Sequence, residues 1–186
     1  MSIPQRIQEV YQKSTCIFTK TQIEKALDEM AIEIHNTLSE SNPVLLCVLK
    51  GGIVLAGNLL PRLDFPLELD CVHATRYQGA TQGGELHWKV IPQVKLKDRT
   101  VLILDDILDG GITLQSIVDF CQEQGAKKTL TAVLLNKTAT RMEGGLKTAD
   151  FTALMVEDRF VFGYGLDYEE YLRNAPGIFE VAPEHQ

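Results

Sequence analysis

Apolar residues recur at helical spacing near the start of the chain and later form short unbroken runs. Between residues 19 and 40, apolar side chains follow one another at intervals of three and four: Ile23, Leu27, Met30, Ile34 and Leu38. This spacing places them on one face of a helix. Thr21 and Glu24 have the spacing of a capping box, so we expect the helix to begin beside them.

Continuous apolar runs predict strands that are covered on both faces, as in a parallel sheet. Strands are expected over residues 44–49, 67–75, 86–91, 100–104, 130–135 and 151–156. Helices are expected over residues 53–63 and 114–124, and Gly125 ends the second of them. Strand, helix and strand within about 35 residues make a right-handed βαβ unit. The pattern therefore predicts an α/β fold, a single domain over residues 1–186 with a central, mainly parallel sheet flanked by helices.

Residues 76–85 interrupt this pattern. They contain three glycines, and their apolar side chains are limited to Tyr77 and Ala80, so the segment cannot pack a core. Both a mobile loop and a plain long hairpin connection fit the sequence.

Composition and charge exclude several classes of protein. The chain is 45% hydrophobic and 23% charged, which is typical of a globular protein. Its 18 Lys and Arg against 25 Asp and Glu give a net charge of −7, which opposes binding to nucleic acid. The densest basic stretch, Lys95, Lys97 and Arg99, alternates with Leu96 and Asp98, as in a solvated strand or turn.

The four cysteines form no C-x-x-C pair, and no apolar run is long enough for a membrane span. We expect reduced thiols, a cytoplasmic location, and neither a nucleic-acid nor a membrane partner. The start of the chain also lacks the apolar stretch of a signal peptide.

Candidate chemistry is concentrated in residues 101–113, VLILDDILDGGIT. Asp105, Asp106 and Asp109 stand where an apolar strand ends, and ligands of open α/β sheets bind at that edge. Two glycines then lead into a helix that we expect Thr113 to cap, where free amides and the helix dipole favour a phosphate. A ribose 5-phosphate would satisfy both the carboxylates and the amides, whereas a solvated turn with a helix cap is the alternative.

This segment resembles the phosphoribosyl-diphosphate fingerprint of the type I phosphoribosyltransferases, which has four apolar residues, two acids, two apolar residues and D-x-G-x-T. Further motifs resemble the hypoxanthine-guanine branch: Leu49-Lys50-Gly51-Gly52, Asn136-Lys137-Thr138, Arg159-Phe160-Val161, Gly163-Tyr164, and Asp167-Tyr168 through Tyr171 and Arg173. The resemblance implies a hood formed by the N- and C-terminal segments, and phosphoribosyl transfer to hypoxanthine or guanine. It also implies Mg2+ as cofactor and a homodimer or homotetramer.

The resemblance also implies roles for single residues. Asp105 and Asp106 would hold the ribose hydroxyls, and the 5′-phosphate would be bound by Asp109, Gly110, Gly111, Ile112 and Thr113. Asp109 would also act as general acid or base at purine N7. Its alternative role is that of a plain cap at the helix start.

The remaining implied roles concern pyrophosphate, base, metal and loop. Pyrophosphate would be bound by Lys50, Gly51 and Arg173. Lys137 would donate to the 6-oxo group, Phe160 would stack on the purine, and the backbone of Arg159 and Val161 would read its edge. Asp167 is expected near Mg2+, with Asp105 and Asp106 as further ligands. Arg76 and Tyr77 would close a loop over the site. Surface positions for Lys50 and Arg173 and a core position for Phe160 are the alternatives.

Four positions depart from the family pattern. Arg76 stands where the mammalian-type enzymes have the Ser of a Ser-Tyr pair, and Asp105 stands where Glu is commoner. In the fingerprint, Gly110 replaces Thr or Ser, and Ile112 replaces a variable polar residue.

Other functions fit the sequence less well. An RNA-binding regulator on the same fold needs a basic face, and this chain is acidic. A receiver domain places its acidic pair after the first strand, and a Rossmann dehydrogenase needs G-x-G-x-x-G after an early strand. A xanthine-preferring transferase remains open within the same family, because hypoxanthine, guanine and xanthine share the 6-oxo group.

Overall fold

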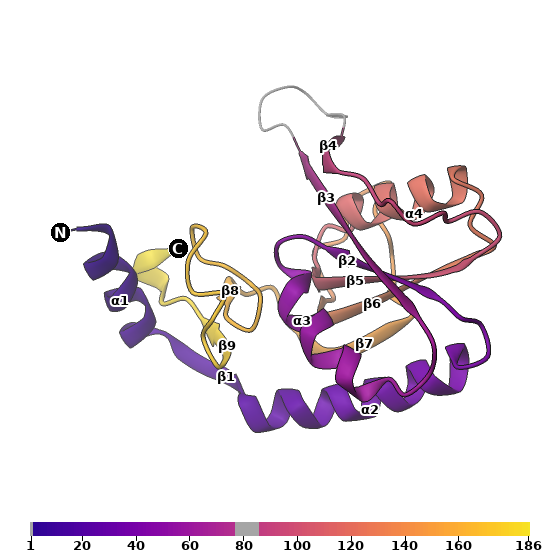
Figure 1. The fold of residues 1–186 in the computed structure, drawn as a ribbon. Coiled ribbons are helices and arrows are strands. Elements are labelled where there is room, and N and C mark those ends of the chain that lie inside the picture. The colour runs from indigo at the N-terminus through magenta and orange to yellow at the C-terminus, as the bar shows by residue number, and fades with distance from the viewer. Residues whose placement is uncertain (1, 77–85) are drawn as a thin grey trace.

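A six-stranded sheet forms the centre of the molecule (Figure 1). The structure, a computed structural model, describes residues 2–76 and 86–186. The strand order is β4-β3-β2-β5-β6-β7, and all neighbours are parallel except the antiparallel pair β3 and β4. The strands are β2 (Val44–Val48), β3 (Glu68–Arg76), β4 (Leu86–Val90), β5 (Thr100–Leu108), β6 (Lys128–Lys137) and β7 (Phe151–Val156). The predicted mainly parallel sheet is confirmed.

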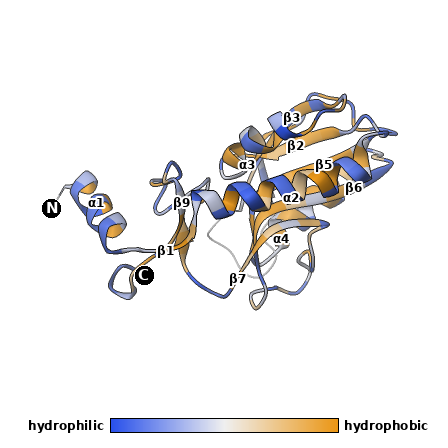
Figure 2. Cartoon of the chain, turned by 90° about the horizontal axis from the view of Figure 1, so that it is seen from below, coloured by the Kyte–Doolittle hydropathy of each residue, from blue (hydrophilic) through white to orange (hydrophobic). Residues whose placement is uncertain are grey.

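Helices cover both faces of this sheet. One hydrophobic cluster joins α2 (Lys20–Leu38) and α3 (Gly52–Leu59) to Leu102 and Leu104, and a second joins α4 (Ile112–Glu123) to Val101 and Ile103. All four of these β5 side chains are fully buried. In the view of Figure 2, α2 crosses in front of the sheet and carries both hydrophilic and hydrophobic residues. Burial on both faces explains why the strands are continuously apolar rather than alternating.

Two helix boundaries differ from the sequence prediction. The N-cap of α2 is Thr19, and its side chain forms a capping box with Gln22, so the predicted box of Thr21 and Glu24 is wrong. Thr19 has the extended backbone of a cap, whereas Thr21 and Glu24 already lie inside the helix. The helix expected over residues 53–63 is divided into α3 and a 3-10 turn, Leu60–Arg62.

β5 continues four residues beyond the predicted end of the strand. The apolar run stops at Leu104, but pairing with β6 continues to Leu108 opposite Asn136. Asp105 and Asp106 therefore lie within the strand and not behind it. Backbone pairing, which the polarity of a side chain does not reveal, sets the true end.

The two ends of the chain form a smaller unit, which we call the hood. It contains α1 (Ile3–Lys13) and an antiparallel sheet of β1 (Thr15–Thr19), β9 (Gly177–Glu180) and β8 (Val161–Phe162). A short 3-10 turn, Pro183–His185, follows β9. In Figure 1 the hood lies to the left of the main sheet, next to α3 and the start of α2, and it contains both termini. Ile178 and Tyr164 of this unit share the hydrophobic cluster of α2 and the main sheet.

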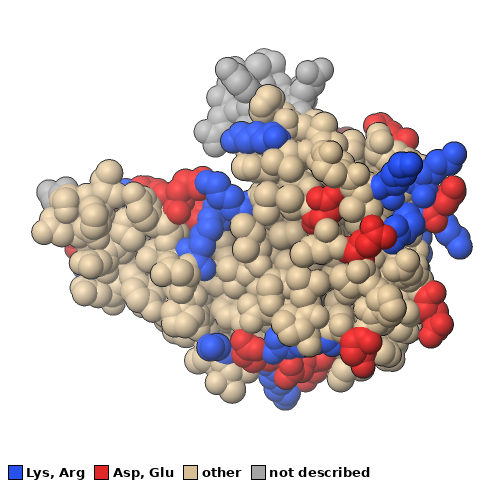
Figure 3. Space-filling view, viewed as in Figure 1, with Lys and Arg blue, Asp and Glu red and all other residues tan. Residues whose placement is uncertain are grey.

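Charged residues are mixed on the face that Figure 3 shows. There Lys and Arg gather at the end of the molecule away from the hood, with acidic side chains among them, and both signs alternate along its lower edge. Lys95 and Lys97 are exposed in the turn before β5, while Leu96 between them is buried. Within residues 2–76 and 86–186, no helix has the length and apolar character needed to cross a membrane.

Candidate active site

The site lies where β5 extends beyond the end of its pairing with β2. β2 pairs with β5 only as far as Cys47 opposite Leu104, whereas β6 stays paired up to Leu108. Beyond Leu104, one edge of β5 therefore faces the turn of residues 49–51 that follows β2. Asp105 and Asp106 lie on this stretch.

Gly51 lies directly against Asp106. A Cβ atom built on Gly51 would lie 1.8 Å from Asp106 Oδ2, so no other residue fits unless the carboxylate moves. The peptide bond between Leu49 and Lys50 in the same turn is cis. Gly51 is thus required here by a close approach of its backbone to a side chain.

A cavity of about 400 Å³ opens between these elements. Its lining brings Gly51, which was predicted for pyrophosphate, together with all the predicted ribose and 5′-phosphate residues: Asp105, Asp106, Asp109, Gly110, Gly111, Ile112 and Thr113. Met142, which the sequence did not suggest, contributes to the wall. The acidic pair, the glycine turn and the start of α4 thus face one space, whose volume is typical of small-molecule sites.

The start of α4 presents backbone amides to this cavity. Gly111 is the N-cap with a φ of 81°, a left-handed conformation that favours glycine. The first amide of α4 with a backbone acceptor is that of Gln115, which donates to Gly111 O at 2.9 Å. The amides before it have no intrahelical partner, as at any helix start. Thr113 lies in the first turn, so the prediction that it caps the helix is wrong, because the chain turns at Gly111.

The loop between β6 and β7, which the sequence did not suggest as part of the site, holds the turn before α4 through hydrogen bonds. Arg141 Nη1 donates to Leu108 O at 2.9 Å and also to Asp109 O, while its Nη2 donates to Asn136 Oδ1. The Met142 amide donates to Gly110 O at 3.0 Å. Arg141 lies in a segment without helical or strand periodicity, so no pattern marked it. The neighbouring Gly144-Gly145 pair is the signal that could have indicated this loop, because a Cβ on Gly145 would lie 2.2 Å from Gly110 O.

Lys137 stands at the end of β6, between two carboxylates. Its Nζ is 3.3 Å from Asp109 Oδ2 and 3.4 Å from Asp158 Oδ1, and the residue is 9% exposed. Asp109 is not the helix cap, which excludes the structural alternative for it. Asp158, which directly precedes Arg159, was not predicted. Lys137 thus joins the turn before α4, through Asp109, to the segment that leads into the hood.

The other predicted purine residues belong to that hood segment and do not line the described cavity. Phe160 is 48% exposed and packs edge-on against Tyr168, so it is not a core residue. Val161 is buried in β8. The Arg159 side chain pairs with Glu180 at 2.7 Å and Glu157 at 2.8 Å, which leaves its backbone as the part available to a ligand.

Of the predicted pyrophosphate residues, Gly51 lines the cavity, whereas Lys50 and Arg173 meet in a cluster of ion pairs outside its lining. Lys50 pairs with Glu170 at 2.7 Å, and Arg173 pairs with Asp167 at 2.7 Å and more distantly with Glu170 at 3.6 Å. Asp167 also accepts the Glu170 amide at 2.8 Å. The structure therefore brings Lys50, Arg173 and Asp167 together, with Glu170 as a partner that the sequence did not suggest.

The predicted loop residues fall at the margin of what the structure describes. Arg76 is the last residue of β3, and Tyr77 lies outside the described residues. Loop closure by this pair stays a prediction.

The acidic pair is held in an environment that favours protonation. Desolvation by burial raises the pKa of Asp105 well above its usual value, and the neighbouring Asp106 charge adds to the rise. Burial also raises the pKa of Asp106, although a hydrogen bond to Asp105 and the charge of Arg173 oppose it. A raised pKa is typical of carboxylates in a binding site when no ligand is present to offset their desolvation. Such carboxylates suit hydroxyl groups or a cation.

The comparison with known proteins decides the family. The model of the phosphoribosyl transferase domain matches residues 14–169. The chain belongs to the phosphoribosyltransferase family. The predicted resemblance to this family is therefore confirmed.

Relatives and solved structures agree with this assignment. A hypoxanthine-guanine phosphoribosyltransferase of Bacillus subtilis is 33% identical over 170 residues, which cover 90% of this chain and 92% of the relative. A hypoxanthine-guanine-xanthine phosphoribosyltransferase of Tritrichomonas foetus is 29% identical, over 87% of this chain and 88% of its own. A hypoxanthine phosphoribosyltransferase structure from Staphylococcus aureus has a TM-score of 0.86 at 29% identity and covers 91% of this chain and 92% of its own.

A further solved structure contains a ligand. The hypoxanthine phosphoribosyltransferase of Trypanosoma cruzi, in complex with the product IMP, has a TM-score of 0.85 at 26% identity and covers 94% of this chain and 96% of its own. The fold of this phosphoribosyltransferase thus matches enzymes of the hypoxanthine branch over nearly its whole length.

The contact between Gly51 and Asp106 predicts how this phosphoribosyltransferase responds to a methyl group. Gly51→Ala displaces the Asp106 carboxylate, so we expect IMP binding to weaken by at least about tenfold, the loss of one charged hydrogen bond. Isothermal titration calorimetry measures this, with circular dichroism to confirm the fold.

Gly57→Ala is the matched control. A Cβ on Gly57, in the exposed part of α3, meets nothing within 4 Å. We expect this variant to be more stable by about 0.5–1 kcal/mol, the usual gain for alanine over glycine in a helix. Unchanged IMP affinity in Gly51→Ala would contradict the close approach.

The half-buried acidic pair predicts an unusual pH dependence of stability. A folded pKa raised above the unfolded value of about 4 means that the stabilisation by Asp105 is present at low pH. It is lost as the pH rises through the folded pKa. Asp105→Asn should therefore unfold at a higher temperature than the parent at pH 7.5, by about 2–4 °C for each 1 kcal/mol relieved, and the gain should shrink toward pH 4.

Thermal unfolding followed at several pH values, without ligand, measures this difference. Asp119→Asn, which removes an exposed carboxylate from α4, is the control and should show no such pH-dependent gain. A lower unfolding temperature for Asp105→Asn at pH 7.5 would mean that the carboxylate stabilises the free protein.

Proposed function

We propose that this chain is a purine salvage enzyme that transfers the 5-phosphoribosyl group of 5-phosphoribosyl-1-diphosphate to hypoxanthine and/or guanine. The products are IMP or GMP and pyrophosphate. The observation that carries this proposal is the single cavity in which Asp105 and Asp106 face the amide-rich start of α4. It agrees with the activity after which the relatives are named.

The cavity suits a ribose 5-phosphate along its length. Asp105 and Asp106 would accept hydrogen bonds from the 2′- and 3′-hydroxyls, which offsets the desolvation of these carboxylates. The amides of residues 110–113 and the Thr113 hydroxyl would donate to the 5′-phosphate, with the helix dipole favouring its charge. Arg141 keeps this turn in place through its bonds to Leu108 and Asp109.

Pyrophosphate would bind between the turn after β2 and the hood. Lys50 and Arg173 carry positive charge, and Gly51 lies against Asp106 of the acidic pair. The Arg173 Nε is buried and has no hydrogen-bond partner among the described residues, so the guanidinium would meet an anion through Nη2, which pairs with Asp167 and Glu170 in the free protein. Binding would draw Lys50 and Arg173 from Glu170, whose pKa they hold below its usual value in the free protein, Lys50 more strongly.

The base would lie between Lys137 and Phe160. The Lys137 ammonium would donate to the 6-oxo group, which favours oxopurines because adenine offers an amino group there. Phe160 would stack on the ring, and the backbone of Arg159 and Val161 would contact its edge. As the bond from C1 to pyrophosphate breaks and a bond from C1 to N9 forms, Asp109 would take the proton that leaves N7.

We propose Mg2+ as the cofactor, held mainly by substrate phosphates. The residues fit this arrangement in part: Asp105 and Asp106 offer oxygen ligands, but both Asp167 oxygens are engaged by Arg173 and the Glu170 amide. Within the described ranges, no group of three or more metal-ligating side chains comes together. When bound, Mg2+ would neutralise charge on the leaving pyrophosphate.

We also propose that residues 1–186 form one phosphoribosyltransferase domain in the cytoplasm. The shared hydrophobic cluster of hood and sheet supports a single domain. Four free cysteines, two of them buried, are typical of a reducing compartment.

The base preference gives the direct test of this function. We expect turnover with hypoxanthine and guanine in the presence of Mg2+, and slower turnover with xanthine. Lys137→Met should lower kcat/KM for both bases by about a hundredfold, the cost of losing a charged hydrogen bond. Steady-state rates at saturating 5-phosphoribosyl-1-diphosphate measure this.

Lys128→Met is the matched control, because Lys128 begins the same strand that Lys137 ends, and it is exposed. This control should retain the parental kcat/KM. A folded parent protein that turns over none of the three oxopurines would refute the enzymatic function and favour the regulator on the same fold.

We further propose that the chain forms a homodimer or homotetramer through an apolar groove beside Lys50. The groove, about 440 Å³ in volume, lies between α3 and β3 and exposes Ile53 by 52% and Leu69 by 50%. A second copy of the chain would cover these side chains. In a Trypanosoma cruzi relative, the C-terminal region has a role in the oligomeric state and enzymatic activity.

A charge placed in this groove should separate the copies. We expect Leu69→Lys to shift the protein to the monomer in light scattering, since a buried unpaired charge is costly in an interface. Ile32→Lys, on an exposed position of α2, should leave the oligomeric state unchanged. An unshifted mass for Leu69→Lys would contradict this interface.

A further inference from the structure

Two consecutive hood residues connect the predicted pyrophosphate residues to a remote polar network. Tyr164 and Gly165 both have positive φ values, 50° and 113°, so the chain turns sharply there. Gly165 is bound to Arg173 twice: its amide donates to Arg173 O at 3.0 Å, and its carbonyl accepts from Arg173 Nη1 at 2.8 Å. The position of this turn therefore sets the position of the Arg173 guanidinium.

The same turn lies directly on the loop that carries Lys50 and Gly51. A Cβ on Gly165 would lie 2.5 Å from Gly51 O and 3.5 Å from the Val54 Cβ. The hood and the turn after β2 thus touch through backbone at Gly165 and Gly51. A small shift of either backbone would change the distance between Gly51 and Arg173.

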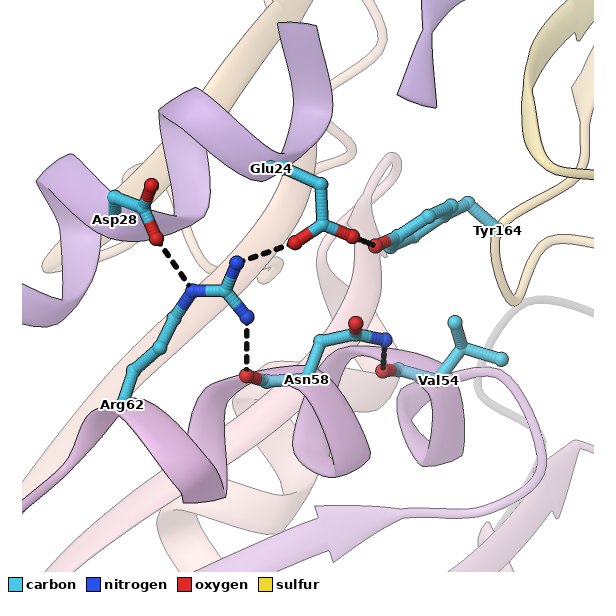
Figure 4. A network of polar contacts seen from close by, with 6 residues as sticks. All are labelled: Glu24, Asp28, Val54, Asn58, Arg62 and Tyr164. Atoms are coloured by element: carbon cyan, nitrogen blue, oxygen red, sulfur yellow. Dashed lines mark hydrogen bonds and ion pairs between the residues drawn. The ribbon is translucent and has the colours of Figure 1, made fainter. Parts of the chain in front are cut away.

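A partly buried polar network fixes this contact from the other side (Figure 4). The Tyr164 hydroxyl donates to Glu24 Oε1 at 2.6 Å, and Tyr164 is only 6% exposed. Glu24 Oε2 pairs with Arg62, whose Nε also binds Asp28 Oδ1 at 2.7 Å. Because hydrogen bonds to charged groups in partly buried positions are strong, this network holds the hood to α2 firmly.

The network also reaches the helix that begins at the Gly51 turn. Arg62 Nη1 donates to Asn58 O at 2.7 Å, and the Asn58 side chain donates to Val54 O at 2.8 Å. Val54 is the α3 residue that contacts Gly165. One set of polar groups therefore holds both α3 and the hood turn that lies against its start.

We propose that Glu24 and Tyr164 are positioning residues of the pyrophosphate subsite, which fix the spacing between Gly51 and Arg173 without touching substrate. This role rests on the proposed function. The base side of the site is held differently, since Phe160 O accepts the Val181 amide within the hood sheet at 2.9 Å. Loss of the network should therefore affect the diphosphate more than the base.

Tyr164→Phe, Glu24→Ala and Glu24→Gln test this role. We expect Tyr164→Phe and Glu24→Ala to raise the KM for 5-phosphoribosyl-1-diphosphate about 10- to 100-fold, within the range of one lost charged hydrogen bond. The KM for hypoxanthine should stay within about twofold. Glu24→Gln keeps an acceptor for the Tyr164 hydroxyl and should restore most of the affinity. The double variant of Tyr164→Phe and Glu24→Ala should be no worse than Glu24→Ala alone, since Glu24→Ala already breaks the bond to the Tyr164 hydroxyl.

Calorimetric binding of magnesium pyrophosphate to each variant gives a readout that does not need turnover. Its Kd should rise by the same factor as the KM for the diphosphate. Should the parent bind pyrophosphate but transfer to no oxopurine, the proposed function fails while this measurement still decides the positioning role.

Tyr168→Phe is the matched control. Tyr168 is another buried hood tyrosine, and its hydroxyl donates to His185 O at 2.9 Å, remote from Gly51. This variant should lose thermal stability without a selective rise in the KM for the diphosphate. The proposal is overturned if Tyr164→Phe leaves that KM within twofold, raises both KM values equally, or behaves like Tyr168→Phe.

Discussion

The unequal pairing of β5 is the constraint on which the site depends. β6 keeps β5 extended up to Leu108, while β2 releases its other edge after Leu104. The edge of β5 that β2 leaves unpaired carries two carboxylates, and the turn after β2 folds back so closely that a Cβ on Gly51 would displace the Asp106 carboxylate. The strand then passes directly into the left-handed Gly111 and the open amides of α4. Backbone pairing thus places two kinds of group around one cavity: carboxylates suited to hydroxyl groups, and amides suited to a phosphate. This placement does not depend on the rotamers of the side chains.

The hood contributes the Arg173 guanidinium beside the site of the main sheet. In the proposed function, Lys137 at the sheet edge would bind the base, and Lys50 and Arg173, which share the partner Glu170, would bind the leaving diphosphate. Because the hood and sheet share a hydrophobic cluster and the link from Glu24 to Tyr164, these cations stand at a fixed distance from the acidic pair. The charges of the free site are consequently compensated within the protein. Asp105 and Asp106 have raised pKa values, and Lys50 and Arg173 already pair with Glu170 and Asp167. Substrate would exchange these internal pairs for its own oxygens.

The sequence predicted what is local and missed what is made by distant pairing. The fingerprint of residues 101–113 could be interpreted because its acids, glycines and threonine all lie within one strand, turn and helix start. The end of β5 could not, since β6 decides it, and the cap of α4 shifted from Thr113 to Gly111 because a backbone turn competes with a hydroxyl. Thr19 was overlooked in favour of Thr21, as both have a suitable residue three positions later. Arg141, Asp158 and the Glu24–Tyr164 bond span irregular or remote segments, and no periodicity reveals such contacts.

A crystal structure of the chain with IMP and Mg2+ tests the central claim most directly. The account predicts the ribose hydroxyls within hydrogen-bond distance of Asp105 and Asp106, and the 5′-phosphate on the amides of residues 110–113. A nucleotide whose phosphate lies away from the start of α4, or whose ribose does not meet the acidic pair, would contradict it.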